Sequence, residues 1–335
     1  MGAAEFGFRI REELQLVEPE SGALVGQAPE PGPAGVPVCG TAEEARRWLV
    51  ERRRWVAEWA AARGLAVMAA GLNLAGRGEA GRGRRGGGDA SGLAGFGMRV
   101  EVGVPDREAA VRAMVGAASY VPHLLAVSAS SPFHRGRDTG FASFRTILRE
   151  RQPAAGLPFP VSSAAEYDRL VSVLSGGGRA NAVGWDLRPG ERAPVLEWHF
   201  FDVTPWVDVA VFLAACARAL TAMFIDRPPP QPTAVELQVA RENRWRAARY
   251  GLDARFYRMD PVSGEERGAA DAIRALVVRL GPLAERLGDG PALACVERIL
   301  ERGSAAGAMR EVYRREGCVR AVARWVIGET ASAGS

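Results

Sequence analysis

The apolar stretch from Pro205 to Phe224, PWVDVAVFLAACARALTAMF, limits the possible folds of this 335-residue chain more than any other segment. Almost all of its residues are apolar, and a helix with that composition is normally buried. Asp208 and Arg218 interrupt the run, which argues against a membrane-spanning segment. A chain of this length buries a core large enough to enclose such a helix. The sequence therefore predicts a buried core helix, in a chain whose length fits either one large domain or two.

The other expected elements follow an order that does not fit a regular β–α–β alternation. Period-two patterns predict strands, and capping boxes predict helix starts. Because strands precede and interrupt helices irregularly, we expect the α+β class with an antiparallel sheet. The capping boxes are Thr41–Glu44, Ser163–Glu166 and Thr233–Glu236, and Trp48, Trp55 and Trp59 should lie on the buried side of the first helix. Expected strands cover 8–17, 65–74, 98–102, 182–189 and 194–202, and expected helices cover 41–63, 106–119, 164–174, 204–224 and 233–250, with three more after 268.

Composition excludes several classes of function. All 43 basic residues are Arg, so neither a Schiff-base lysine nor a P-loop lysine is available. A formal charge of +4 is too small to predict a nucleic-acid or membrane partner. The four cysteines lack metal-site spacing, and the N-terminus has no signal-peptide pattern. We therefore expect a reduced, cytoplasmic protein without structural zinc.

Residues 75–97, AGRGEAGRGRRGGGDASGLAGFG, form a low-complexity run of Gly and Arg. Such a run buries too little apolar surface to order itself, which predicts a flexible loop. An RNA-contacting tract or a lid over a site would be functional alternatives.

The strand expected at 98–102 carries Arg99 and Glu101 on one face, while its other residues are apolar. Charges on one strand face are usually solvated. The same arrangement also fits a face that lines a binding site for an ion or a phosphate. Both interpretations stay open at this point.

A glycine-rich loop at 134–145 holds Arg135, Arg137, Asp138 and Arg145. Small residues allow close approach of a ligand, and arginines bind phosphate or carboxylate groups. The alternative is a buried turn held by pairing of Arg with Asp.

The stretch LEWHFFD at 196–202 predicts Glu197, His199 and Phe201 on one strand face, with Trp198 and Phe200 on the other. Glu and His two residues apart can bind a metal or orient a substrate, or they can simply form a hydrogen-bonded pair. A helical segment, ENRWRAARYG at 242–251, adds Asn243, Arg246 and Arg249 at helical spacing, a pattern that is usually solvated.

Taken in order, the stretches GVPDRE, SASSPF, GRDTGFASFR, WDLRP, LEWHFFD and NRWRAARYGLD resemble glutamate–cysteine ligase family 2, the carboxylate–amine ligases. The resemblance extends from about residue 8 to 325 and implies a single ligase-like domain over residues 1–330, with the flexible loop at 75–97 inside it. It implies a curved antiparallel β-sheet flanked by helices, like the catalytic domain of glutamine synthetase. It also implies that ATP and Mg²⁺ phosphorylate a carboxylate, typically the γ-carboxyl of glutamate, and that an amine such as that of cysteine then attacks the acyl phosphate.

The resemblance also assigns candidate site residues. Candidate magnesium ligands are Glu13, Glu101 and Glu197, since Mg²⁺ prefers hard oxygen ligands. Candidates for substrate or phosphate binding are Arg11, Arg99, Arg145, Arg188, His199, Asp202, Asn243 and Arg249.

The chain departs from the family pattern at the strands that carry the metal site. Arg11 stands where the family has the first carboxylate of Gly-x-Glu-x-Glu, and the family's His-Val-His-Val has become Arg99-Val100-Glu101-Val102. His199 replaces a family Arg, and the stretches 33–39 and 71–75 lack the family's acid and histidine. Two hypotheses follow: a ligase with an altered metal site, or a non-catalytic member that acts as a partner or regulatory subunit. The expected ligands are a small carboxylate and an amine, with a protein partner or a second copy also possible.

Overall fold

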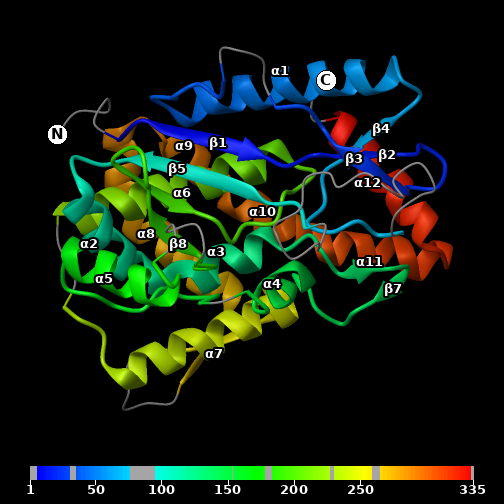
Figure 1. The fold of residues 1–335 in the computed structure, drawn as a ribbon. Coiled ribbons are helices and arrows are strands. Elements are labelled where there is room, and N and C mark those ends of the chain that lie inside the picture. Colours follow the sequence, from blue (N-terminus) through cyan, green and yellow to red (C-terminus); the bar gives the residue numbers. More distant parts are fainter. Residues whose placement is uncertain are drawn as a thin grey trace.

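The computed structural model describes residues 6–30, 35–75, 95–152, 154–177, 183–226, 230–258 and 265–332. Apart from its ends, the predicted flexible loop at 75–97 lies outside the described residues. Figure 1 shows two long strands running side by side through the middle of the molecule, with helix α1 above them and helix α6 below.

A four-stranded antiparallel sheet forms the centre of the fold, as predicted. Its strands lie in the order β1 (Phe8–Glu12), β5 (Met98–Gly103), β9 (Val195–Trp198) and β8 (Leu187–Pro189). Each neighbouring pair is antiparallel. The alternation of side chains gives the sheet one apolar face, which is buried. Its residues include Phe8, Ile10, Val100, Val102, Leu196 and Trp198.

Helix α6 (Val207–Asp226) packs against this sheet and is the core helix that the apolar stretch predicts. It also contacts α1 (Ala42–Ala61), α2 (Arg107–Ala117) and α8 (Ala269–Leu287). By length and hydropathy, Arg107–Ser128 and Val207–Asp226 are both able to cross a membrane, but 67% and 83% of their most apolar windows are buried inside the protein. Such burial is typical of core helices.

The remaining elements surround this centre. A second sheet has the strand order β3 (Leu24–Gln27), β2 (Gln15–Val17) and β4 (Ala66–Met68). Two further pairs of strands join β6 (Phe133–His134) to β7 (Arg137–Asp138) and β10 (Arg255–Tyr257) to β11 (Glu266–Gly268). The other α-helices are α3 (Val121–Ser128), α4 (Phe144–Arg149), α5 (Ala164–Leu174), α7 (Ala234–Tyr250), α9 (Gly290–Ala294), α10 (Val296–Arg302), α11 (Ala305–Glu316) and α12 (Val319–Ser332).

Three expectations about the elements were wrong. The strand predicted at 8–17 is two strands in different sheets, and the described chain has five helices after residue 268 where three were expected. Trp55 is exposed, not buried. Helix α1 instead buries Leu49 and Val56, together with Arg52 and Arg53, because the two arginines meet the carboxylate of Glu12 beneath the helix.

Candidate active site

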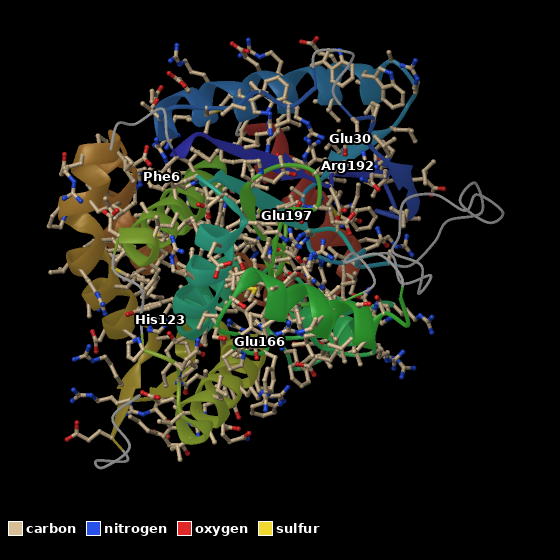
Figure 2. All side chains as sticks on the ribbon, turned by 60° about the vertical axis from the view of Figure 1, so that its left-hand side comes forward. Phe6, Glu30, His123, Glu166, Arg192 and Glu197 are labelled. Atoms are coloured by element: carbon tan, nitrogen blue, oxygen red, sulfur yellow. The ribbon has the colours of Figure 1, made fainter. Side chains whose placement is uncertain are left out.

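A cavity of about 580 Å³ opens on the polar face of the central sheet. The polar side chains of β1, β5, β8 and β9 form its floor, and loop residues such as Glu30 and Arg192 form part of its wall. Figure 2 labels Glu197, Glu30 and Arg192 among the lining residues. The charged face of strand 98–102 thus lines a cavity and does not lie on an open surface.

Strand register brings the charged residues of the floor together. Arg9 pairs with Glu101, Glu101 pairs with Glu197, and Glu197 pairs with Arg188, which makes one row across all four strands. Arg11 and Arg99 pair with each other in a neighbouring row of the same face. Because side chains alternate along a strand, all of these groups point into the cavity.

Three arginines surround the carboxylate of Glu101. Arg11 Nε donates a hydrogen bond to Glu101 Oε1 at 2.9 Å. The Nη1 atoms of Arg9 and Arg99 lie 3.9 Å and 4.0 Å from the same carboxylate. The side chains of Arg9, Arg11 and Arg99 are 34%, 39% and 41% exposed, so their guanidinium groups remain accessible from the cavity.

Glu197 forms a second charged cluster with His199 and Arg188. Its Oε2 lies 2.6 Å from His199 Nε2 and 3.4 Å from Arg188 Nη2, and that Nη2 is 2.8 Å from His199 Nε2. Burial and the nearby arginines hold the pKa of His199 well below its ordinary value. A neutral ring carries one N–H, so Nε2 either donates to Glu197 or accepts from Arg188.

Phe201 does not share the polar face with Glu197 and His199, contrary to expectation. Strand β9 ends at Trp198, and the buried Phe201 ring stacks on the Trp198 ring with centroids 6.3 Å apart. The chain therefore turns the side chain of Phe201 into the core.

Arg145 lines the cavity, and Asp202 lies buried behind it. Arg145 Nη1 donates to the carbonyl oxygens of Phe200 and Phe201, and it lies 3.6 Å from Asp202 Oδ1. Asp202 is fully buried and accepts from Ser130 N and from Ser131 Oγ. Burial raises the pKa of Asp202. Arg145 lines the cavity, whereas Asp202 holds the chain behind it.

Glu13 completes the set of predicted magnesium ligands, but its carboxylate is already engaged. It lies beyond the end of β1, and its Oε2 accepts from the backbone N–H of Gly97 at 2.6 Å. The described part of the chain contains no group of three or more acidic, His or Cys side chains arranged to hold a metal ion.

The charges on the floor do not suit a divalent cation. Glu101 and Glu197 together carry −2, and the four arginines beside them, Arg9, Arg11, Arg99 and Arg188, carry +4. A divalent ion about 5 Å from one guanidinium meets a repulsion on the order of 6 kcal/mol at an effective dielectric constant near 20. The residues present therefore do not fit a magnesium site of the kind that the sequence resemblance implies.

Two predicted substrate residues lie away from the cavity. The Asn243 amide bonds to the backbone N–H and carbonyl of Tyr257, both at 2.8 Å, and lines a separate cavity of about 360 Å³. Arg249 stacks on the ring of Phe141 at 4.8 Å. Helix α7 thus uses both residues to hold neighbouring segments, and the structure does not bring them to the candidate site.

Arg9 is a cavity residue that the sequence reasoning missed. It lies two positions before Arg11 on the same strand, so the period-two pattern was a usable signal. No comparable signal exists for Glu30 or Arg192, because both reach the cavity from loops whose positions depend on the tertiary fold.

Comparisons with known proteins agree with this architecture. The family model described as Glutamate-cysteine ligase family 2 (GCS2) matches residues 92–324. Relatives named for glutamate–cysteine ligase 2 come from Herpetosiphon aurantiacus, with 29% identity over 97% of this chain and 93% of the relative, and from Chloroflexus aurantiacus, with 30% identity over 98% and 93%.

Two solved structures share the fold. A glutamate–cysteine ligase from Francisella tularensis in complex with AMP has a TM-score of 0.64 at 12% identity and covers 98% of this chain and 89% of its own. A bifunctional glutathione synthetase from Pasteurella multocida has a TM-score of 0.67 at 14% identity and covers 99% of this chain and 53% of its own. The resemblance of the sequence motifs and the α+β fold are both confirmed, and the chain belongs to glutamate–cysteine ligase family 2.

Proposed function

We propose that the protein is an ATP-dependent carboxylate–amine ligase with an altered metal site, which forms an amide bond through an acyl phosphate. The observation that carries the proposal is the arginine-lined cavity on the polar face of the sheet of a family member. Family membership, the names of the relatives and the AMP bound in the Francisella tularensis ligase support ATP and a carboxylate as ligands.

The arginines supply the binding chemistry. A guanidinium group presents several N–H donors in a plane, which suits the oxygens of carboxylates and phosphates. Arg9 and Arg99 make only long contacts to Glu101, so most of their donors face the cavity. These residues bind and orient the anionic ligands, and the neighbouring cations disperse negative charge that develops during transfer.

The Glu197–His199 pair supplies a site for proton exchange. An amine that attacks an acyl group has to lose a proton, and the Glu197 carboxylate, whose Oε2 lies 2.6 Å from His199 Nε2, is a suitable acceptor. Both groups line the cavity. In this proposal, the Glu197 carboxylate accepts the proton, and His199 donates a hydrogen bond from Nε2 that orients the carboxylate.

Magnesium has no step in this proposal, since the floor residues do not fit it. The same ion pairs favour a second candidate function: a family member that has lost catalysis, keeps one ligand and acts as a partner or regulatory subunit. In that case the carboxylates serve to hold the arginines in place and take no part in chemistry.

Compartment and ligands belong to the proposal as well. All four cysteines, Cys39, Cys216, Cys295 and Cys318, are free thiols, as expected for a protein of the reducing cytoplasm. The small ligands are a carboxylate, with glutamate as the first candidate, and an amine, with cysteine as the first candidate.

The test is a product screen with purified protein, ATP, glutamate and cysteine, followed by other pairs of acids and amines. The acid takes the γ-phosphate of ATP and leaves ADP, and the amine then displaces inorganic phosphate, so the amide forms only when acid and amine are both present. Arg99→Gln should lose the product, whereas Arg324→Gln, an exposed arginine on α12, is the matched control.

A triple variant separates the two candidates. Arg11→Glu, Arg99→His and Glu101→His restore the family's residues at the floor. Product from the natural protein that is lost in the triple variant supports an altered but working ligase. Product from the triple variant alone supports the non-catalytic candidate.

A further inference from the structure

Six arginines and five glutamates line the cavity, and three of the arginines gather on its floor. Arg9, Arg11 and Arg99 converge on one face of the β1–β5 strand pair, and we name them the arginine triad. The backbone register fixes two of them opposite one another, Arg11 and Arg99. Their side chains are all at least one-third exposed, and the cavity is the space into which they open.

Glu101 is the counter-ion of this triad. It is the acidic group in contact with all three arginines, and its side chain is only 11% exposed. Three guanidinium groups at this spacing repel one another, so the carboxylate offsets the repulsion when no ligand is bound. A counter-ion differs from a metal ligand in its effect on binding. As a counter-ion, the Glu101 carboxylate competes with an incoming anion for the same arginines.

We propose that the arginine triad takes the place of a divalent cation, so that the cavity binds a polyphosphate chain directly and without Mg²⁺. The inference rests on the proposed function only for the choice of ligand, a nucleotide phosphate chain. Guanidinium groups bind phosphate oxygens by charge-assisted, paired hydrogen bonds, which a metal-free site requires.

Added Mg²⁺ should therefore oppose binding. A magnesium complex of a nucleotide carries two fewer negative charges than the free nucleotide, and its phosphate oxygens are partly occupied. Both effects weaken attraction to a site whose own charge is already positive. In a site built for magnesium, added Mg²⁺ has the opposite effect, because binding of the nucleotide depends on the metal.

Glu101→Gln gives the sharpest contrast between the two arrangements. The substitution keeps the shape of the side chain and removes the charge that competes with the ligand. With the triad as the binding group, phosphate affinity stays the same or increases. With Glu101 as a metal ligand, the same substitution abolishes magnesium-dependent binding.

The experiment is calorimetric titration of the full chain with a non-hydrolysable ATP analogue and, separately, with inorganic tripolyphosphate. Each titration is run in EDTA and in excess MgCl₂. We expect the natural protein to bind both probes in EDTA, with a Kd roughly tenfold higher in excess Mg²⁺. Arg11→Gln or Arg99→Gln should each raise the Kd about tenfold above that of the natural protein under the same conditions, which is the effect of losing one charge-assisted contact. Arg324→Gln should bind like the natural protein, and circular dichroism checks that every variant is folded.

Binding that requires Mg²⁺ and disappears in Glu101→Gln overturns the proposal, as does a folded protein that binds neither probe. Equal affinity for both probes supports recognition of the phosphate chain itself. Preference for the nucleotide supports an added contact to the base, provided that the Arg11 and Arg99 variants still weaken binding. Absence of amide product in the screen above bears on catalysis alone and leaves this result unaffected.

Discussion

His123, a partly buried side chain, illustrates how one residue can make the stability of the protein depend on pH. Its ring packs between the rings of Tyr120 and Phe256, with centroids 5.5 Å and 5.3 Å away, far from the candidate site in Figure 2. Burial lowers the pKa of His123 from 6.5 to about 4. The unfolded chain therefore takes up a proton at a higher pH than the folded protein does.

The resulting prediction concerns acid conditions. Stability from this group is fully present above pH 6.5 and is lost as the pH falls towards 4, by an amount on the order of 3 kcal/mol. His123→Phe keeps an aromatic ring and removes the proton site, so its free energy of unfolding should fall less over that range. Urea unfolding at pH 7, 5.5 and 4.5 measures both proteins. His199 also lowers the free energy of unfolding as the pH falls, by the same amount in the natural protein and in the variant. If the free energies of unfolding of the two proteins depended equally on pH, the prediction would be contradicted.

Gly97 controls the position of Arg145 at the cavity. A Cβ atom at residue 97 would overlap the Arg145 guanidinium and approach the carbonyl oxygen of Phe201 at 3.2 Å. Gly97→Ala should therefore displace Arg145 and weaken binding of the ATP analogue about tenfold, the loss of one charge-assisted contact. Gly26→Ala, where a Cβ has no neighbour within 4 Å among the described atoms, is the control. Calorimetry that gives both variants the natural affinity would rule out this role.

Among the helices and strands, the starts of helices were predicted well, because a capping residue acts within a single helical turn. Thr41, Ser163 and Thr233 each accept a hydrogen bond from the backbone N–H three residues later, and helices α1, α5 and α7 begin directly after them. The split of strand 8–17 had no such signal. The chain changes sheets between Glu12 and Gln15, because β5 and β4 offer different partners on the two sides of that point.

The join between α1 and β1 depends on a buried ion pair. Arg53 Nη2 lies 2.5 Å from Glu12 Oε1, and both side chains are at most 1% exposed. The same guanidinium donates to the carbonyl oxygens of Thr204 and Pro205, just before α6. One arginine thus links the first helix, the first strand and the core helix.

Removing the Glu12 charge should strongly destabilise this join. Glu12→Gln leaves the Arg53 guanidinium buried without its carboxylate, which costs about 3–5 kcal/mol in comparable cases. Glu43→Gln breaks an exposed pair with Arg46 and should cost less than about 1 kcal/mol. Urea unfolding at pH 7 measures both variants, and similar small losses would show that the Glu12 pair does not hold the elements together.

At the scale of the whole molecule, the chemistry of the site was harder to predict than the fold. Motif order and the apolar stretch at 205–224 indicated the family and the core helix. The chemistry of the predicted metal site depended on strand register, because the pairing of Arg9 with Glu101 and of Arg188 with Glu197 brings an arginine to each floor carboxylate. Neither Asn243 nor Arg249 reaches the cavity, because α7 directs them to other segments.

A second buried ion pair connects distant parts of the chain. Arg218 on α6 lies 2.9 Å from Asp289, and both side chains are fully buried. Arg218 also donates to the carbonyl oxygens of Phe6 and Leu287, and Asp289 accepts from the backbone N–H of Ala42 at the start of α1. The N-terminus, α1, α6 and the end of α8 therefore share one network.

This network predicts that residues 1–330 unfold as one cooperative unit. Asp289→Asn leaves Arg218 buried without its carboxylate and should lower stability by about 3–5 kcal/mol. Because the network joins the N-terminal segment, α1 and the end of α8 to the core helix, the entire unfolding curve should move to lower urea, with fluorescence and far-UV circular dichroism still coincident. Two separate transitions, with only one of them shifted, would show that the chain contains two independent domains and that the ion pair stabilises only one of them.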